Sequence, residues 1–228
     1  AFDSTLGQVR QSLERERLFT SDVSHELRTP LMIIATSCEL LAEVKLEQRE
    51  RVQIERIDRA CEEMRELVQT FLQLARDKAN ETAFIASSSL AKVATEQAER
   101  WGPMLREKKL DFQCIEEGTD DGRYNPTFLN AVMANLLRNA LHYTERGFVR
   151  LVIGSGEFRV EDSGSGIPFE QHEQIFQPFV RGTQARGDGL GLGLSLVKRI
   201  CSKQGWTISV QNLPGGGACF SVTLKSVV

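Results

Sequence analysis

The chain has 228 residues, of which 41% are hydrophobic and 26% charged, a balance typical of a soluble globular protein. Its formal net charge of −3 at pH 7 gives no indication of direct nucleic-acid binding or of attraction to a membrane surface. No apolar run approaches the roughly 20 residues that a membrane-spanning helix needs, and no signal peptide opens the chain.

The cysteines are scattered along the chain, odd in number and without the Cys-x-x-Cys spacing of a metal site. We therefore expect neither disulfides nor a zinc site, but buried thiols in a reducing, cytosolic compartment. The five residues concerned are Cys38, Cys61, Cys114, Cys201 and Cys219.

The first third of the chain has the apolar periodicity of helices. Apolar residues recur at spacings of mostly three and four between Val23 and Leu41, and again between Val52 and Ala75. These stripes predict two long helices joined by a short polar turn near residues 43–48. Because a lone helical hairpin leaves much of its stripe facing water, we expect two copies to pair as a four-helix bundle. A hairpin packed on its own C-terminal domain is the alternative.

The segment DKANETAFIASSS interrupts this pattern with small and polar residues, which indicates a domain boundary. We predict a helical domain over residues 1–77, a linker over residues 78–88 and a second domain over residues 89–228.

Helices and strands alternate in the second domain. Pro126 suits the first turn of a helix, and the sequence GSG between two strand-like runs is typical of a hairpin. The pattern predicts an α+β fold, an α/β sandwich with a mixed, largely antiparallel sheet. The predicted helices are 90–105, 126–142 and 194–204, and the predicted strands are 110–115, 147–153, 157–162, 206–211 and 217–224.

Three asparagine-rich or glycine-rich stretches of the second domain hold candidate ligand contacts. Asn135 and Asn139 lie four residues apart on a predicted helix, so their amides share one face, and an amide oxygen suits Mg²⁺. Asp162 ends a predicted strand, where its carboxylate can accept a hydrogen bond from an amine. Gly164 and Gly166 then let the backbone turn tightly and approach a flat base.

The third stretch, GDGLGLGL, leads directly into a predicted helix, which places backbone N–H groups at a helix terminus suited to phosphate. Taken alone, such a glycine run is more often an ordinary loop. The first glycine stretch lacks the strand–helix context of a dinucleotide fingerprint, and the chain has no GxxxxGK[ST] phosphate loop. It is the order of the three stretches together that points to a nucleotide site.

From about Arg17 onward the chain resembles the sensor histidine kinases of bacterial two-component systems. SHELRTPL resembles the phosphoacceptor box of that family, NLLRNA its asparagine box, DSGSGIP its first glycine box, FQPF its phenylalanine box and GDGLGLGL its second glycine box. The resemblance implies a dimerisation and phosphotransfer hairpin followed by a Bergerat-type ATP-binding domain. It also implies that residues 1–16 are a signalling stalk, and that the chain is the cytoplasmic portion of a larger receptor anchored in the inner membrane.

By this resemblance, the protein is a homodimeric enzyme that moves the γ-phosphate of ATP to His25 and then to an aspartate of a cognate response regulator. Glu26 would accept the proton of the ring nitrogen of His25 that does not attack. Arg181 would stabilise charge on the transferring group. Thr29 would orient water in a second activity, dephosphorylation of the regulator; alternatively, its hydroxyl only bonds back to a helix carbonyl.

The resemblance also assigns the nucleotide contacts. Asn139 would ligate Mg²⁺, and Asn135 would support the metal and the phosphates. Asp162 would bind the adenine amino group, and Tyr143 would line the base pocket. His142 stands where the family commonly has lysine or arginine; histidine is shorter and only partly charged near neutral pH, so this phosphate contact is the weakest of the set. The second glycine box would belong to a mobile lid over ATP, with the candidate residues Gly187, Gly189, Leu190, Gly191, Leu192 and Gly193.

Two other functions fit parts of the sequence. An ATPase of the gyrase and heat-shock chaperone superfamily would share the fold, but it has a glutamate where Asn135 stands, and an asparagine cannot take a proton from water. A non-enzymatic dimeric scaffold would have no need of an intact His25, Asn139 and Asp162.

Overall fold

The structure is a computed structural model, and the chain divides into two compact units, Ala1–Ala83 and Phe84–Val228. No helix in the described part of the chain combines the length and the apolar composition that crossing a bilayer requires. The described residues are 31, 32, 34, 36–38, 41, 50, 51, 53, 54, 57, 61, 64, 87–177, 180 and 193–226.

The first unit is helical at every residue that the structure describes, on both sides of the polar stretch at residues 43–48. Leu31, Cys38 and Cys61 are buried. Four other large apolar side chains of the two predicted stripes or their neighbours stay between 40% and 59% exposed in the single chain: Met32, Ile34, Leu41 and Ile57. Part of the apolar surface of this unit is therefore left uncovered by the unit itself.

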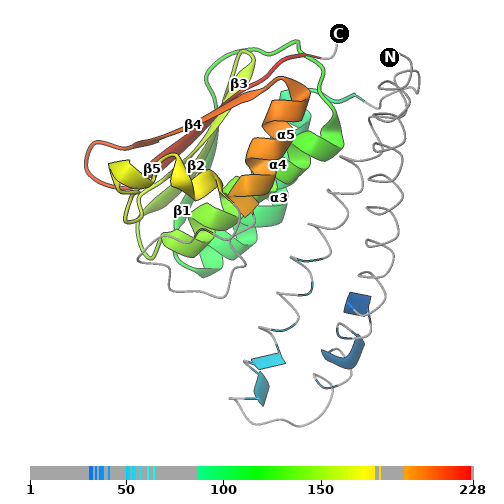
Figure 1. Cartoon of the computed structure of the whole chain (residues 1–228), viewed down its shortest axis with the longest axis vertical. Helices are drawn as coiled ribbons and strands as arrows, with labels where there is room; N and C mark the ends of the chain where they lie inside the picture. The colour runs from blue at the N-terminus through cyan, green and yellow to red at the C-terminus, as the bar shows by residue number, and fades with distance from the viewer. Residues whose placement is uncertain are drawn as a thin grey trace, which may run out of the picture. The chain divides into compact units, whose positions relative to one another are not determined.

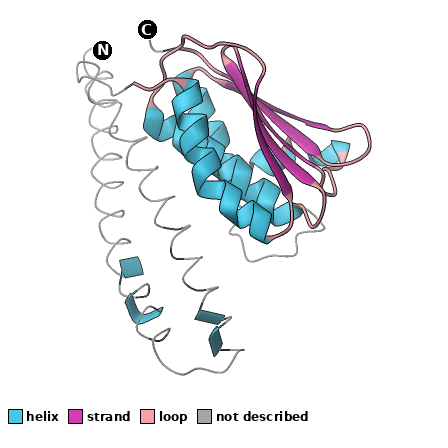
Figure 2. Cartoon of the chain, turned by 180° about the vertical axis from the view of Figure 1, so that it is seen from behind, coloured by secondary structure: helices cyan, strands magenta, loops and turns pink. Residues whose placement is uncertain are grey.

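In the second unit, helices cover one face of a five-stranded sheet (Figure 1), and Figure 2 shows the same two layers from behind. The sheet order is β1-β2-β3-β5-β4; β1 and β2 run parallel, and the remaining neighbours are antiparallel. The predicted α+β fold with a mixed, largely antiparallel sheet is confirmed. The elements are α3 (Leu90–Glu107), β1 (Asp111–Glu116), α4 (Pro126–Tyr143), β2 (Phe148–Gly154), β3 (Glu157–Asp162), η1 (Phe169–Gln171), η2 (Gln174–Phe176), α5 (Gly193–Gln204), β4 (Thr207–Asn212) and β5 (Ala218–Thr223).

Local sequence explains where the central helix and the hairpin begin and end. The Asn125 side chain accepts hydrogen bonds from the backbone N–H groups of Thr127 and Phe128, which caps α4, and Pro126 occupies its first turn. Between β2 and β3 the chain reverses at Gly156, whose φ of +70° favours glycine. As a result, a side-chain cap fixes the start of α4, and a tight turn fixes the start of β3.

The core lies between the helices and the inner face of the sheet. Phe128, Leu136 and Leu137 of α4 are fully buried, as are Val149 and Leu151 of β2. Alternation along β2 and β3 places one set of side chains in this core and the other set on the outer face. The packed core fixes α4 relative to the strand ends, where the candidate site lies.

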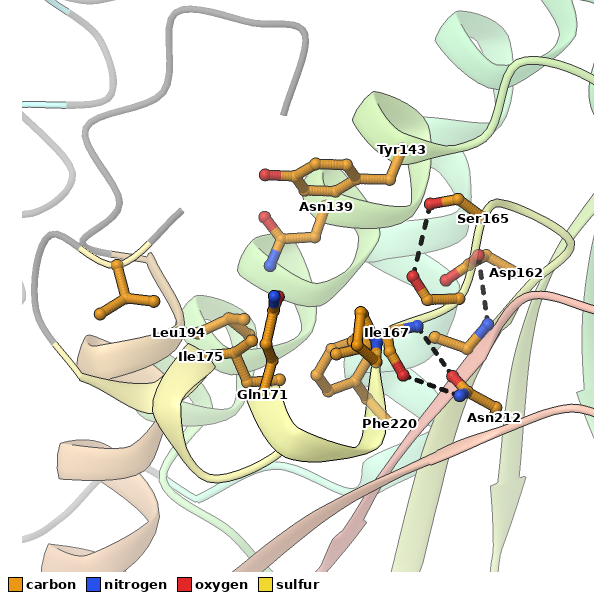
Figure 3. A pocket seen from close by; sticks show the side chains of 14 residues that line it. Asn139, Tyr143, Asp162, Ser165, Ile167, Gln171, Ile175, Leu194, Asn212 and Phe220 are labelled. Carbon is orange, nitrogen blue, oxygen red and sulfur yellow. Dashed lines mark hydrogen bonds between the residues drawn. The ribbon is translucent and has the colours of Figure 1, made fainter. Parts of the chain in front are cut away.

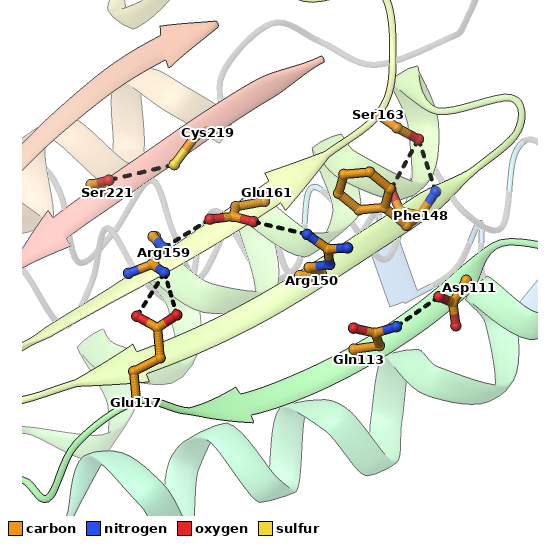
Figure 4. A network of polar contacts seen from close by, with 10 residues as sticks. All are labelled: Asp111, Gln113, Glu117, Phe148, Arg150, Arg159, Glu161, Ser163, Cys219 and Ser221. Carbon is orange, nitrogen blue, oxygen red and sulfur yellow. Dashed lines mark hydrogen bonds and ion pairs between the residues drawn. The ribbon is translucent and has the colours of Figure 1, made fainter. Parts of the chain in front are cut away.

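The outer face of the sheet has a chain of charged contacts (Figure 4). Arg159 binds both carboxylate oxygens of Glu117 at 2.7 Å and donates to Glu161 at 2.8 Å. Arg150 lies 3.8 Å from Glu161 and above the ring of Phe148. The hydrogen bonds to Glu117 and Glu161 raise the pKa of Arg159, so its charge is permanent. Such partly exposed pairs contribute only about 0–1 kcal/mol each, but they neutralise this face.

One expectation about the cysteines is wrong. Cys114 is exposed, because β1 is an edge strand of the sheet. The other four cysteines are buried as expected, and none of the five forms a disulfide.

Candidate functional site

A pocket of about 350 Å³ opens where α4, α5 and the 3₁₀ turns meet the ends of β3, β4 and β5 (Figure 3). Its volume lies within the range of small-molecule sites. Side chains from α4 and from the loop after β3 bring polar groups to it, whereas η2, α5 and β5 contribute apolar walls. The lining residues are Asn139, Tyr143, Asp162, Ser165, Gly166, Ile167, Pro168, Gln171, Ile175, Val180, Leu194, Asn212, Ala218 and Phe220.

Asp162 is the one acidic side chain among these lining residues, and it is only 6% exposed. Its Oδ1 accepts hydrogen bonds from the backbone N–H groups of Gly164 at 2.8 Å and Ala218 at 3.4 Å. Burial raises the pKa of the Asp162 carboxyl, and the two N–H donors oppose that shift because they favour the ionised form. Because both bonds go to Oδ1, the second oxygen, Oδ2, is left for a hydrogen-bond donor on a ligand.

The backbone approaches Asp162 closely from both sides, which requires glycine at two positions. A Cβ on Gly164 would lie 2.5 Å from the carbonyl oxygen of Tyr143 and 2.9 Å from Asp162 Oδ1. A Cβ on Gly217 would collide with the Asp162 carbonyl oxygen. Gly164 was expected from the sequence, but Gly217 was not, although the run PGGGA at residues 214–218 could have indicated it.

The four candidate residues of α4 do not all face the pocket. Asn139 and Tyr143 line it, as Figure 3 shows, and Tyr143 is 40% exposed. Asn135 is buried instead: its Nδ2 donates to the Ala131 carbonyl at 2.8 Å, and its Oδ1 accepts from Arg138. His142 is exposed, with its ring edge-on to Tyr143 at 5.0 Å, and is not among the lining residues.

The start of α5 lies against Asn135. A Cβ on Gly193 would come within 2.7 Å of Asn135 Oδ1 and 3.9 Å of Arg138 Nη2. Gly193 is therefore adjacent to the asparagine motif of α4, although it does not line the pocket. Sequence reasoning missed Arg138, whose position three residues after Asn135 on a helix was the available signal.

The charged run after the first glycine stretch forms the 3₁₀ turns η1 and η2, which the sequence did not predict. Gln171 and Ile175 project from them into the pocket (Figure 3). Phe176 packs edge-on to Phe220 at 6.5 Å. His172 is half-buried, and its Nε2 lies 3.1 Å from the Ile167 carbonyl oxygen.

Several candidates lie outside the described residues. They are the histidine predicted to accept the phosphoryl group, two residues close to it in the sequence, one arginine and most of the second glycine stretch: His25, Glu26, Thr29, Arg181, Gly187, Gly189, Leu190, Gly191 and Leu192.

The described residues fit a nucleotide better than a metal held by protein alone. No group of three or more His, Cys, Asp or Glu side chains within the described residues could hold a metal ion. The amide oxygen of Asn139 is a single hard ligand, which suits Mg²⁺ completed by phosphate oxygens and water. Apolar walls from Ile167, Ile175 and Phe220 suit the faces of a base, with Asp162 at its polar edge.

Two family models match the chain in the order of its two units. Residues 15–80 match the His Kinase A (phospho-acceptor) domain. Residues 124–227 match the histidine kinase-, DNA gyrase B-, and HSP90-like ATPase family. The first match includes His25, and the second includes every lining residue of the pocket.

Two relatives from Pseudomonas aeruginosa illustrate the sequence similarity. Sensor histidine kinase AruS is 34% identical over 217 residues, which cover 89% of this chain and 22% of the relative. Alginate biosynthesis sensor protein KinB is 34% identical over 227 residues, covering 94% of this chain and 38% of the relative. The chain thus spans less than two fifths of the length of either relative.

Solved structures are similar to this chain as well. Full-length ShkA in complex with AMPPNP has a TM-score of 0.66 and 26% identity, covering 91% of this chain and 46% of that one. The catalytic domain of histidine kinase ThkA has a TM-score of 0.53 and 28% identity, covering 62% of this chain and 95% of that one. Both family models, the relatives and these structures agree, and the chain belongs to the sensor histidine kinases of two-component systems.

Proposed function

We propose that this chain binds ATP in the pocket, phosphorylates itself on His25 and passes the phosphoryl group to an aspartate of a response regulator. The observation that carries the proposal is the pocket itself: a buried carboxylate, Asp162, at the edge of an apolar cavity, in a chain that also matches a phospho-acceptor domain. Incubation of the chain with ATP labelled at the γ-phosphate tests it, because a kinase of this kind retains the label on protein.

The base lies between the apolar walls, and its exocyclic amine donates to Asp162. An ionised carboxylate accepts such a bond and repels a carbonyl group, which selects adenine over guanine. Tyr143 covers the open side of the pocket, and the phosphates extend toward Asn139 and the start of α5 at Gly193. The similar full-length ShkA was solved in complex with AMPPNP, which supports the binding of an adenine nucleotide by this chain.

Asn139 would hold Mg²⁺ against the phosphates through its amide oxygen. The bound ion would neutralise charge on the phosphate oxygens. Asn135 supports the adjacent start of α5 through its bond to Arg138 and its contact with Gly193. His142 is exposed, so its side chain would have to change conformation to contact a phosphate.

In the transfer step, His25 is the nucleophile. A neutral ring nitrogen attacks the γ-phosphorus, the bond to the bridging oxygen breaks, and ADP leaves. Glu26 accepts the proton of the other ring nitrogen, and Arg181 stabilises the charge on the transferring group. The lid residues Gly187 and Gly189 to Leu192 exclude water from that step.

The site favours transfer over hydrolysis. A hydrolytic ATPase of this superfamily uses a carboxylate base at the position of Asn135. The amide of Asn135 has no such basicity, and both of its ends are engaged, with Ala131 and with Arg138. An ATPase of the gyrase and heat-shock chaperone superfamily is therefore the weaker candidate.

Replacing Asp162 with asparagine is expected to weaken ATP binding by about 10- to 150-fold. The change removes a charge-assisted hydrogen bond, which contributes about 1.5–3 kcal/mol. Titration calorimetry with ATP and with GTP measures both the loss of ATP affinity and the smaller preference for adenine over guanine. Asp111→Asn, an exposed carboxylate on β1, is the matched control and should keep the parental affinity. Parental ATP affinity in Asp162→Asn would remove Asp162 from the base contact.

The same variant should not lose stability. In the folded chain, the pKa of Asp162 is raised above its ordinary value of 3.8. At a pH between the ordinary and the raised pKa, folding therefore takes up a proton. The free energy of unfolding falls as pH rises between these two pKa values, and this loss of stability remains at neutral pH. Asparagine has no charge to bury and keeps an acceptor for Gly164 and Ala218. The thermal midpoint of Asp162→Asn at pH 7 should equal or exceed that of the parent.

The first unit would bind two partners, a second copy of the chain and a response regulator. The exposed apolar side chains Met32, Ile34, Leu41 and Ile57 would be covered by a second copy of the chain in a homodimer. The response regulator would dock near His25 to receive the phosphoryl group. The part of the protein described here would be the cytoplasmic portion of a receptor anchored in the inner membrane.

A second activity, dephosphorylation of the regulator, depends on Thr29 in this proposal. Its hydroxyl lies four residues after His25 in the sequence and can position a water molecule. Thr29→Ala should keep labelling of His25 and slow dephosphorylation of the regulator by roughly 10- to 100-fold. Thr36→Ala, an exposed threonine of the same unit, is the matched control. Equal loss of both activities in Thr29→Ala would point to a disturbed helix instead.

A further inference from the structure

One side chain binds both peptide groups of a residue in the wall of the pocket. Asn212, the last residue of β4, accepts from the Ile167 N–H at 2.8 Å and donates to the Ile167 carbonyl at 2.7 Å. Figure 3 shows the two bonds side by side at the pocket. The amide therefore pairs with Ile167 as a neighbouring strand would, although the two residues are 45 positions apart in the sequence.

The same short loop is tied to the sheet at its other end. Asp162 receives hydrogen bonds from Gly164 in the loop and from Ala218, and Ala218 is the register partner of Asn212. Residues 163–167 are thus held between Asp162 at the end of β3 and Asn212 at the end of β4, the two strands that flank β5. The loop cannot move relative to the carboxylate without breaking one of these bonds.

Two further contacts support the Asn212 end. The Ile167 carbonyl also lies 3.1 Å from His172 Nε2, which requires the imidazole to carry its proton on that nitrogen. Gly166 has a φ of +68°, and a Cβ there would lie 3.0 Å from Asn212 Oδ1. The left-handed turn at Gly166 therefore allows Asn212 to reach Ile167.

We propose that Asn212 is a positioning residue for the nucleotide base: it fixes the Ile167 wall at a set distance from the Asp162 carboxylate. The inference rests on the proposed binding of ATP in this pocket. Because both peptide groups of Ile167 are hydrogen-bonded, the slot between Ile167 and the other apolar walls of the pocket is formed before the ligand enters. Binding therefore does not have to order the Ile167 wall. Its width and the position of Asp162 together decide which base fits.

Asn212 is exposed, so its loss should leave the fold intact while loosening this slot. In the full chain, Asn212→Ala should raise the dissociation constant for ATP about tenfold, because binding must then order a wall that two hydrogen bonds hold in the parent. The preference for ATP over GTP should narrow, because the carboxylate and the wall no longer move together. The turnover of autophosphorylation at saturating ATP should stay within about twofold of the parent, since ground-state binding is what changes.

Two variants make the experiment specific. Asn212→Asp has the same size and keeps the acceptor for the Ile167 N–H but lacks the donor for the carbonyl, so it should also weaken ATP binding. Gln211→Ala removes an amide from the adjacent residue of β4, which points to the other face of the sheet, and should bind ATP as the parent does.

Titration calorimetry of the full chain with ATP and with GTP, together with thermal midpoints, decides the question. Weaker ATP binding with a reduced ATP-to-GTP preference in both Asn212 variants, in chains whose thermal transition shows that they remain folded, supports the positioning role. Parental affinities in both variants overturn it, and so does an equal loss for both nucleotides. If the parent itself binds neither nucleotide, the proposed function fails first, and the role of Asn212 falls with it.

Discussion

Replacing Asn139 with alanine is expected to abolish autophosphorylation while leaving the fold intact. The Asn139 side chain faces the pocket from α4, and in the proposed function its amide oxygen holds Mg²⁺ against the phosphates. Alanine is the best helix former and removes no core packing at this half-buried position. We expect labelling to fall by about 100-fold or more, the scale of losses caused by disturbing a metal site.

The measurement is ATP binding with and without Mg²⁺, followed by labelling. In the parent, Mg²⁺ should strengthen ATP binding, and in Asn139→Ala this dependence should disappear. Asn130→Ala is the matched control, because Asn130 lies on the same helix but binds Gln97 and the Pro126 carbonyl. That variant should lose some stability and keep the Mg²⁺ dependence. An unchanged Mg²⁺ dependence in Asn139→Ala would remove Asn139 from the site.

The second large effect is expected for His25→Gln, which should bind ATP like the parent and accumulate no label. Glutamine is polar and of similar length, but it has no nucleophilic ring nitrogen. Because ATP binds through residues of the second unit in our proposal, the affinity should not change.

The chain offers direct controls for this variant, since it has three histidines. In His142→Gln and in His172→Gln, whatever label forms should still be located on His25 by peptide mapping. Label that persists in His25→Gln, or that maps to either of the other two histidines, would disprove the assignment.

Local signals explain why the elements of the second unit were predictable. The Asn125–Pro126 pair starts α4, and GSG marks the β2–β3 hairpin, so both act within a few residues. The strand-like run at residues 157–162 likewise predicted the strand and placed Asp162 at its end. The strands differ from the prediction by only a residue or so at their ends, where fraying makes bounds uncertain.

Contacts between distant segments were not predictable. Asn212 and Ile167 are 45 residues apart, and Ala218 and Asp162 are 56 apart, so no local pattern could have joined them. The burial of Asn135 against Arg138, and the exposure of Cys114, depend on packing and on strand order. Sequence spacing placed Asn135 and Asn139 on one face, but only the tertiary structure separates the one that faces the pocket.

The chemical stability of the label tests the central claim most directly. A phosphoryl group on a histidine nitrogen is a phosphoramidate, which is lost in acid and kept in alkali, whereas phosphoserine and phosphothreonine behave in the opposite way. The full chain, incubated with Mg²⁺ and ATP labelled at the γ-phosphate, should yield protein-bound label with that acid-labile, alkali-stable behaviour, and none in His25→Gln. Label that survives acid, or that appears only as free phosphate with none on the protein, would contradict the assignment as a histidine kinase acting through His25.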